Sequence, residues 1–285
     1  MKVCRFTLNS DAGARPRVGV LIDDAVHDVT TVTGELPPLQ WPAPPGDLFI
    51  GHLPQLRPLM EDLAKAAPPL PRDQVRLLSP VANPGKFVCG AGNWKHHGAP
   101  LGMMGFMFKA SSALAGESEG VQIRWPDRIT LHEPELAIVI GRECANVSAA
   151  EALSYVAGYC CALDMTMKPE REDYAFCKSF DTYGVLGPGL VTAKLLQGAH
   201  IVRAFNAISY RSLAPNAHRA GEPLGIPIAG DEEKAIALAT SLIKEIGFEP
   251  VLVGGLAMGK YLVPGTPLGG EHTPAELRQI AATLK

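Results

Sequence analysis

The sequence has no long apolar run, and this absence limits the classes of protein to which it can belong. No segment approaches the roughly 18 consecutive apolar residues of a membrane-spanning helix, and the first twenty residues lack the apolar stretch of a signal peptide. Lys and Arg number 26 against 29 Asp and Glu, without a run of like charges. We therefore expect a cytoplasmic globular protein that has neither nucleic acid nor a membrane surface as a partner.

Two short motifs are also missing. The six cysteines show no C-x-x-C spacing, which favours reduced core thiols over zinc sites or disulfides. No G-x-G-x-x-G occurs, and "CGAGNW" supplies only its first two glycines, so no dinucleotide-binding turn is indicated. "GESEG" at 116–120 fits the G-x-S-x-G pattern. Because the "VQIRWPDR" that follows is typical of a strand and not of a helix, Ser118 is expected in a loop.

Hydrophobic patterning predicts a β-rich first part. "RVGVLIDDAVHDVT" indicates two strands around Asp23-Asp24, and "HLPQLRPLMEDLAKAA" indicates a helix. A boundary is expected near residues 70–80, followed by a strand from Lys86 to Cys89. "RITLHEPELAIVIG" predicts a strand pair or one bent strand, and "GYCCALDM" a second apolar strand. Between them "VSAAEALSYVAGYC" predicts a helix capped by Ser148, with Glu151 completing a capping box.

The pattern changes after about Leu196. "GAHIVRAFNAIS" indicates a strand, "DEEKAIALATSLIKEIG" a helix with Asp231 as its cap and Gly247 past its end, and "FEPVLVGGL" a further strand. This order predicts a β-α-β unit. We therefore expect a small N-terminal domain over 1–75, a core over 76–197 and a separate C-terminal segment over 198–285.

Two carboxylates stand two positions apart in "LHEPELAIVIG". On a strand, Glu133 and Glu135 share one face, while Pro134 between them indicates an edge or a bulge. Side-by-side carboxylates repel unless a cation lies between them, and Asp164 adds a third oxygen ligand at the end of the next apolar strand. Three carboxylates without a cysteine suit a hard dication, Mg²⁺ or Mn²⁺. The other interpretation of the pair is a solvated strand face.

Longer stretches carry a family resemblance. "LHEPELAIVIGRECANVSAAEALSYVAGYCCALDMT", with "KFVCGAGNWKHHG" before it and "KSFDTYGVLGPGLVTA" after it, resembles the fumarylacetoacetate hydrolase family. "RPRVGVLIDDAVHDVT" is similar to the small N-terminal domain of many bacterial members, so the resemblance spans about residues 3–195. It implies an α+β fold with a mixed β-roll core, and a homodimer.

The resemblance also implies roles for individual residues. Glu133, Glu135 and Asp164 match the family's metal ligands, and Lys178 and His97 its catalytic lysine and histidine. Further matches, implied to bind substrate, are Lys109, Asp181 and Thr182. A metal-bound 2-oxo acid would have its carbonyl polarised, Lys178 would stabilise the enolate, and His97 would activate water or move a proton. Implied substrates are acylpyruvates and dienedioates from aromatic-ring catabolism, and implied reactions are C–C hydrolysis, isomerisation and decarboxylation.

The sequence departs from the family pattern at two places. Hydrolytic members usually carry a glutamate three residues after the histidine, where this chain has Pro100; His96 is a possible substitute proton carrier. In place of the core's further strands, residues from about 198 to 285 resemble the C-terminal part of NADP-dependent deazaflavin-type reductases. Two alternatives to a metal-dependent hydrolase or isomerase therefore stay open: an NADP-linked oxidoreductase, and a chimeric, non-catalytic protein that binds metal without turnover.

Overall fold

The computed structural model describes residues 1–11, 13, 15–42, 45–91, 105–168, 174–192, 202–205, 207–263 and 265–284. These residues form two compact units, one extending to residue 192 and one beginning at residue 202. No helix within these ranges is long and apolar enough to cross a membrane.

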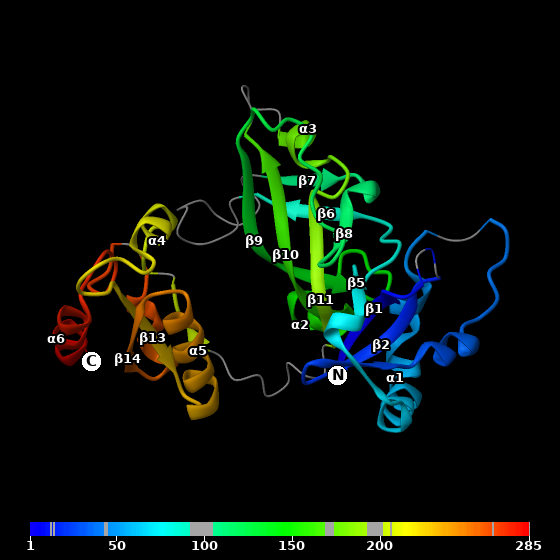
Figure 1. Cartoon of the computed structure of the whole chain (residues 1–285), viewed down its shortest axis with the longest axis horizontal. Coiled ribbons are helices and arrows are strands. Elements are labelled where there is room, and N and C mark those ends of the chain that lie inside the picture. Colours follow the sequence, from blue (N-terminus) through cyan, green and yellow to red (C-terminus); the bar gives the residue numbers. More distant parts are fainter. Residues whose placement is uncertain are drawn as a thin grey trace. The chain divides into compact units, whose positions relative to one another are not determined.

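The first unit is built on a nine-stranded sheet, in which β9, β10 and β11 lie side by side (Figure 1). The strand order is β4-β3-β2-β1-β11-β10-β9; in addition β5 pairs with β1, and β8 runs parallel to β11. A separate two-stranded sheet joins β6 and β7. The strands are β1 Lys2–Leu8, β2 Arg17–Ile22, β3 Ala25–Asp28, β4 Pro69–Pro71, β5 Val75–Leu78, β6 Phe87–Gly90, β7 Phe106–Lys109, β8 Leu114–Gly116, β9 Thr130–Ile140, β10 Val156–Met167 and β11 Gly184–Thr192.

The N-terminal strands belong to the same sheet as the strands that carry the acidic residues. The predicted hairpin is present as β2 and β3, with Asp23 at a positive φ of 51° in its turn. Val3 of β1 pairs with Val20 of β2 on one side and with Leu190 of β11 on the other. Hydrogen bonding therefore continues from the N-terminal strands into the core strands. The division into domains at residue 75 stays a prediction.

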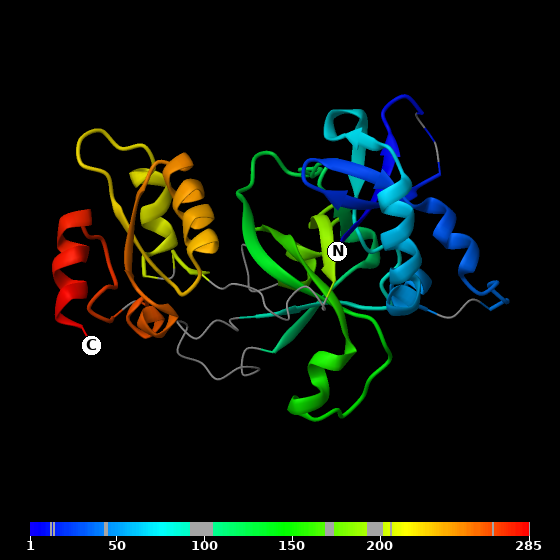
Figure 2. The same cartoon turned by 90° about the horizontal axis from the view of Figure 1, so that it is seen from below.

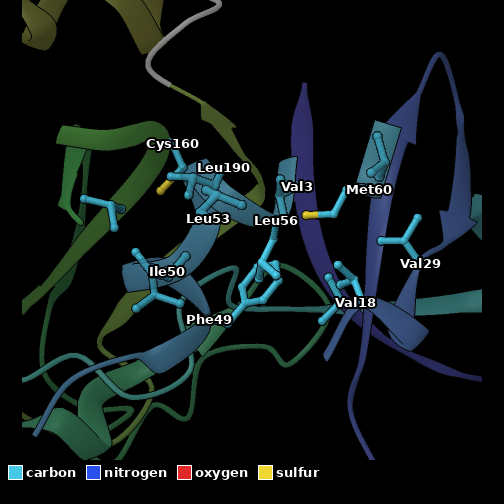
Figure 3. Close-up of a cluster of buried hydrophobic side chains, with 14 of the residues drawn as sticks. Val3, Val18, Val29, Phe49, Ile50, Leu53, Leu56, Met60, Cys160 and Leu190 are labelled. Atoms are coloured by element: carbon cyan, nitrogen blue, oxygen red, sulfur yellow. The ribbon is translucent and has the colours of Figure 1, made fainter. Parts of the chain in front are cut away.

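One long helix covers a face of this sheet. Helix α1 (Leu48–Ala66) begins at Asp47, whose carboxylate accepts a hydrogen bond from the Ile50 amide at 3.2 Å. Its buried side chains recur at helical spacing and pack against strand residues such as Val3 and Leu190, as Figure 3 shows. The labelled members of this core cluster are Val3, Val18, Val29, Phe49, Ile50, Leu53, Leu56, Met60, Cys160 and Leu190.

The connection between β9 and β10 differs from the prediction. The helix expected over 147–160 is reduced to one turn, α2 (Ala149–Ala152), and a 3-10 turn, and β10 already begins at Val156. The Ser148 hydroxyl donates to the Glu151 carboxylate at 2.7 Å and makes no cap bond to the backbone. Pairing of the β-branched residues Val156 and Ile140 overrides the local helix propensity, so the helix begins after Ser148 as predicted but is much shorter than expected.

The second unit contains the predicted β-α-β arrangement. The strands β13 (Gly225–Gly230) and β14 (Glu249–Gly254) are parallel and are joined by α5 (Glu233–Glu245), while the short β12 (Val202–Arg203) pairs with β13. All six residues of β13 are buried, because α5 and α6 (Pro274–Thr283) lie on opposite sides of the sheet (Figure 2). The remaining helix is α4, Tyr210–Asn216.

The start of α5 corrects a detail of the prediction. Glu232, not Asp231, is the N-cap residue, and its carboxylate accepts from the Ala235 amide at 2.7 Å. The Asp231 carboxylate instead accepts from the Leu256 amide at 2.8 Å and ties the end of β13 to the segment after β14. Gly247 follows the helix with a φ of 88°, as expected for a residue past a helix C-terminus.

Candidate active site on β9 and β10

Two carboxylates face each other across the β9–β10 pair. Antiparallel pairing places Asp164 directly opposite Glu133 and places Ala162 opposite Glu135. Because alternate residues of a strand share a face, the register brings Glu133, Glu135 and Asp164 to one face of the sheet. Pro134 stands in the edge strand of the sheet, as its missing amide hydrogen predicts.

The ammonium group of Lys178 lies between the two facing carboxylates. Its Nζ is 3.1 Å from Glu133 Oε2 and 2.8 Å from Asp164 Oδ2. Lys178 is the last residue of the short helix α3 (Tyr174–Lys178), and its side chain is almost fully buried. The segment just after it packs through aromatic rings, with Phe180 and Tyr183 in an edge-on contact at 5.2 Å between ring centres.

Thr166 completes the hydrogen bonding of this group. The Lys178 ammonium donates to Thr166 Oγ1 at 2.5 Å, and the Thr166 hydroxyl donates onward to Glu133 Oε1 at 2.9 Å. Lys178 therefore uses all three of its N–H donors. Thr166 was not among the site residues predicted from the sequence, although its place two residues after Asp164 on the same strand face was a usable signal.

A second buried ammonium group, that of Lys109 at the end of β7, approaches Asp164 from the other side. Lys109 Nζ lies 2.7 Å from Asp164 Oδ1, and the side chain is only 1% exposed. The same nitrogen donates to three backbone carbonyl oxygens: Lys178 at 2.5 Å, Tyr183 at 2.8 Å and Met165 at 3.3 Å. Asp164 therefore holds one lysine with each carboxylate oxygen.

The pKa values of the two lysines are shifted in opposite directions from the ordinary lysine value. Burial lowers the pKa of Lys109, and the nearby Asp164 only partly opposes this effect. Burial alone would also lower the pKa of Lys178, but its contacts with Asp164 and Glu133 outweigh burial and raise the pKa. Lys178 is therefore a firmly held cation between two anions.

The two facing carboxylates are oxygen ligands of the kind that a hard dication prefers, although here the Lys178 ammonium lies between them. Glu133 and Asp164 already share one positive group, Lys178, and Asp164 Oδ1 is buried and accepts no aligned hydrogen bond, its partner being the ion-paired Lys109. Glu133 is 41% exposed, so this side of the pair is open to a ligand. Within the part of the chain that the structure describes, no three His, Cys, Asp or Glu side chains close into a set able to hold a metal ion.

The other predicted site residues are placed as follows. His97, together with His96 and Pro100, lies outside the described residues. The Asp181 carboxylate binds the Arg124 guanidinium at 2.9 Å on the surface. The Thr182 hydroxyl accepts from the Gln122 amide at 2.8 Å, and its φ of 69° is unusual for a β-branched residue. Substrate contacts of Asp181 and Thr182 stay predictions.

The cysteines and Ser118 take no visible part in the site. None of the six cysteines forms a disulfide, and burial raises the pKa of Cys4 and Cys160 to about 12. Burial, and after it the Asp164 charge, raises the pKa of Cys89 to about 11, which is well above neutral pH. Ser118 lies in a turn after β8, where its hydroxyl accepts from the Leu77 amide at 3.0 Å, as a structural loop residue does.

Comparison with known proteins relates the chain to one family of enzymes. The family model "Fumarylacetoacetate (FAA) hydrolase C-terminal" matches residues 87–218. The maleylpyruvate hydrolase of Aquipseudomonas alcaligenes is 42% identical over 209 residues, which cover 67% of this chain and 70% of that protein. The human mitochondrial oxaloacetate tautomerase FAHD2A is 32% identical over 148 residues, 48% of this chain and 47% of that protein.

Solved structures show the same fold. A maleylpyruvate hydrolase from Sphingobium sp. SYK-6, crystallised with manganese(II) and pyruvate, is 32% identical and superposes with a TM-score of 0.57 over 72% of each chain. A fumarylacetoacetate hydrolase from Exiguobacterium antarcticum is 24% identical, with a TM-score of 0.54 over 72% of this chain and 71% of that one, and supports the fold alone.

Fold and site together define an α+β enzyme of the hydrolase and isomerase type. The chain belongs to the fumarylacetoacetate hydrolase family. None of the relatives named above is a reductase, and the family model extends to residue 218, into the segment for which the sequence indicated a reductase resemblance. That second resemblance is therefore unsupported by these relatives.

Proposed function

We propose that this chain is a divalent-metal-dependent hydrolase of an acylpyruvate, with maleylpyruvate as the first substrate to test. The observation that carries the proposal is the convergence of Glu133, Asp164 and Lys178 on one face of the β9–β10 pair. Support comes from the 42% identical maleylpyruvate hydrolase and from the related structure that holds manganese and pyruvate. A cytoplasmic location stays a prediction.

Three carboxylates of the chain would hold the ion, which we expect to be Mg²⁺ or Mn²⁺. Glu133 and Asp164 face each other, and Glu135 lies on the same face one pleat further along β9. A divalent ion bound there would supply Lewis-acid polarisation of the 2-oxo group. This role requires oxygen ligands and a site that a small anionic substrate can reach, which the partly exposed Glu133 permits.

Hydrolysis of an acylpyruvate breaks one C–C bond and consumes one water. The water oxygen adds to the acyl carbonyl, and the bond to the methylene carbon breaks. The electron pair leaves on the pyruvate enolate, which takes up a proton to give pyruvate beside the carboxylic acid. The three N–H donors of Lys178 already have acceptors, so its ammonium would stabilise negative charge that develops nearby through its positive charge and not through a further hydrogen bond. We assign removal of the water proton to His97, as the resemblance implies.

The decisive experiment measures maleylpyruvate loss by the metal-free chain, alone and after addition of Mg²⁺ or Mn²⁺. We expect turnover only with the ion, and none for Glu135→Ala. Glu143→Ala, which removes an exposed carboxylate just beyond β9, is the matched control and should retain activity. Unchanged turnover after chelation would overturn the proposal. Metal binding without turnover would support the non-catalytic alternative, and keto–enol interconversion without cleavage would reassign the chain as an isomerase.

The NADP-linked alternative meets a physical obstacle at α5. Three acidic residues in a row, Asp231, Glu232 and Glu233, stand where β13 passes into the helix. A helix N-terminus binds phosphate when its amides are free and no negative charge is close, whereas Glu232 here occupies an amide itself. A titration with NADPH should therefore show no binding, and saturable binding would revive the alternative.

We also propose the homodimer that the resemblance implies. Among the described strands β9 lies at one edge of the sheet, and its side chains Leu136, Ile138 and Ile140 are more than half exposed. A row of apolar side chains on an edge strand favours pairing with another sheet. Analytical ultracentrifugation should give a dimer for the parent and a monomer for Ile138→Lys. Leu252→Lys, at an exposed apolar position of the second unit, should stay dimeric.

A further inference from the structure

Lys109 carries a positive charge that has no access to solvent. Its side chain is 1% exposed and enters from β7, outside the main sheet. Four oxygens lie within 3.3 Å of Nζ: one from the Asp164 carboxylate and three from the backbone at Met165, Lys178 and Tyr183. An ammonium group has only three N–H donors, so none remains for a substrate.

The partners of this ammonium group are parts of the proposed catalytic apparatus. The carbonyl of Lys178 is held at 2.5 Å, at the residue whose side chain lies between the two carboxylates. Asp164 forms an ion pair with Lys109 through Oδ1 and with Lys178 through Oδ2, so two cations together fix the orientation of its carboxylate. The carbonyls of Met165 and Tyr183 tie the same ammonium to β10 and to the segment before β11.

We propose that Lys109 is a positioning residue, which orients the Lys178 backbone and the Asp164 carboxylate and does not touch the substrate. This inference rests on the proposed function and departs from the substrate-binding role that the family resemblance implies for Lys109. Lys109 acts as a buried cation that binds oxygen atoms of three segments, each more than 50 residues away from it in the sequence. Groups that orient metal ligands and catalytic side chains affect affinity and turnover without contacting either reactant.

The first test compares kinetic constants for Lys109→Met, which keeps the side-chain length and removes the charge. A positioning role predicts that kcat falls about 10²-fold while KM changes little, because Lys178 no longer points correctly. Lys109→Met should add no further loss of kcat in a Lys178→Met background, since both changes remove the same contribution. A raised KM with kcat retained, or additive losses, would overturn the proposal. Lys168→Met, an exposed lysine after β10, is the control and should behave like the parent.

The second test does not depend on turnover. Calorimetric titration of the metal-free chain with Mn²⁺ should show affinity about tenfold or more weaker for Lys109→Met and unchanged for Lys168→Met. Equal Mn²⁺ affinity in the two variants would overturn the role assigned at Asp164. If the parent binds Mn²⁺ but turns over no acylpyruvate, the proposed function fails while this measurement still decides the role of Lys109.

A third measurement uses the parent chain, so it stands even if Lys109→Met does not fold. Nitrogen-15 spectra of lysine ammonium groups show only those shielded from exchange with water, and Lys109 should give such a signal. Addition of pyruvate with Mg²⁺, which is diamagnetic and so does not broaden nearby signals as Mn²⁺ would, should leave the signal in place for a positioning residue. Loss or a large shift of this signal on pyruvate addition would show direct contact and overturn the proposal.

Discussion

Glu133 of β9 and Asp164 of β10 are direct partners in the antiparallel register, and the Lys178 ammonium bridges them at 3.1 and 2.8 Å. Two like charges so placed would force one carboxyl to take up a proton unless a cation stays nearby. Lys178 thus neutralises the pair, and Lys109 neutralises the far oxygen of Asp164. The site is an alternation of two anions and two buried cations, held by four different segments of the chain.

Replacing Lys178 by Met should remove most of the activity. The ammonium group is the one described cation in contact with both Glu133 and Asp164, and its loss leaves these carboxylates facing each other. We expect kcat to fall by about 10²-fold or more, the usual effect of losing one charged stabilising group. Steady-state kinetics on maleylpyruvate with saturating Mn²⁺ measures the change. Lys65→Met, at an exposed lysine of α1, serves as the control, and equal rates in the two variants would contradict the role of Lys178.

Asp164→Asn should destabilise the first unit more than the removal of any surface carboxylate does. The substitution leaves Lys109 and Lys178, both nearly buried, without their common anion. Breaking a buried ion pair from one side costs about 3–5 kcal/mol of unfolding free energy. Urea unfolding of the metal-free protein measures it. Asp181→Asn removes an exposed pair with Arg124 and should cost at most about 1 kcal/mol, and similar losses for both variants would be the contrary result.

Stability in acid should depend on Asp28. Burial alone would raise the pKa of this carboxyl, but hydrogen bonds from Thr30 and the Arg17 guanidinium outweigh burial and hold the pKa below the ordinary 3.8. A carboxyl group whose pKa is lowered in the folded state stabilises the protein at pH values above its ordinary pKa. This stabilisation is lost as the pH falls through the folded-state pKa. The parent should therefore exceed Asp28→Asn in unfolding free energy at neutral pH and lose this advantage as the pH falls below the ordinary value of 3.8 and through the lowered folded-state pKa. Asp62→Asn, on an exposed α1 pair, should match the parent throughout.

The second unit should be sensitive to the start of α6. Thr273 accepts from the Glu276 amide at 3.2 Å, and the Glu276 carboxylate accepts from the Thr273 amide at 2.8 Å, which forms a capping box before the buried Pro274 and Leu277. Thr273→Ala should cost about 1 kcal/mol in thermal or urea unfolding of this unit. Thr273→Ser keeps the hydroxyl and should recover most of the loss, whereas equal destabilisation by both substitutions would argue against the cap.

Local patterning predicted the two strands that carry the carboxylates of the site, but not the helix α3 that carries Lys178, nor the contacts within the site. The alternation around Glu133 and Glu135 and the apolar run before Asp164 predicted β9 and β10, and strand periodicity placed Glu133 and Glu135 on one face. That Asp164 shares this face follows from the β9–β10 register, which periodicity does not give. The helix expected before β10 is present but shorter than predicted, because Val156 pairs with Ile140 and this tertiary contact outweighs propensity. The contact between Lys109 and Asp164 spans 55 positions, a separation at which neither spacing nor periodicity carries a signal.

Thr166, which was not predicted from the sequence, contributes to the alignment of the site. Its hydroxyl accepts from Lys178 and donates to Glu133, so it transmits the orientation of one group to the other. Thr166→Val preserves shape at this buried position but leaves a Lys178 donor unpaired, at a cost of about 1–3 kcal/mol of unfolding free energy. We also expect kcat to fall by about tenfold, since part of the Lys178 alignment is lost. Thr166→Ser retains the hydroxyl and should keep near-parental kcat; a Ser variant as impaired as the Val variant would show that the methyl group, and not the hydrogen bond, is what matters.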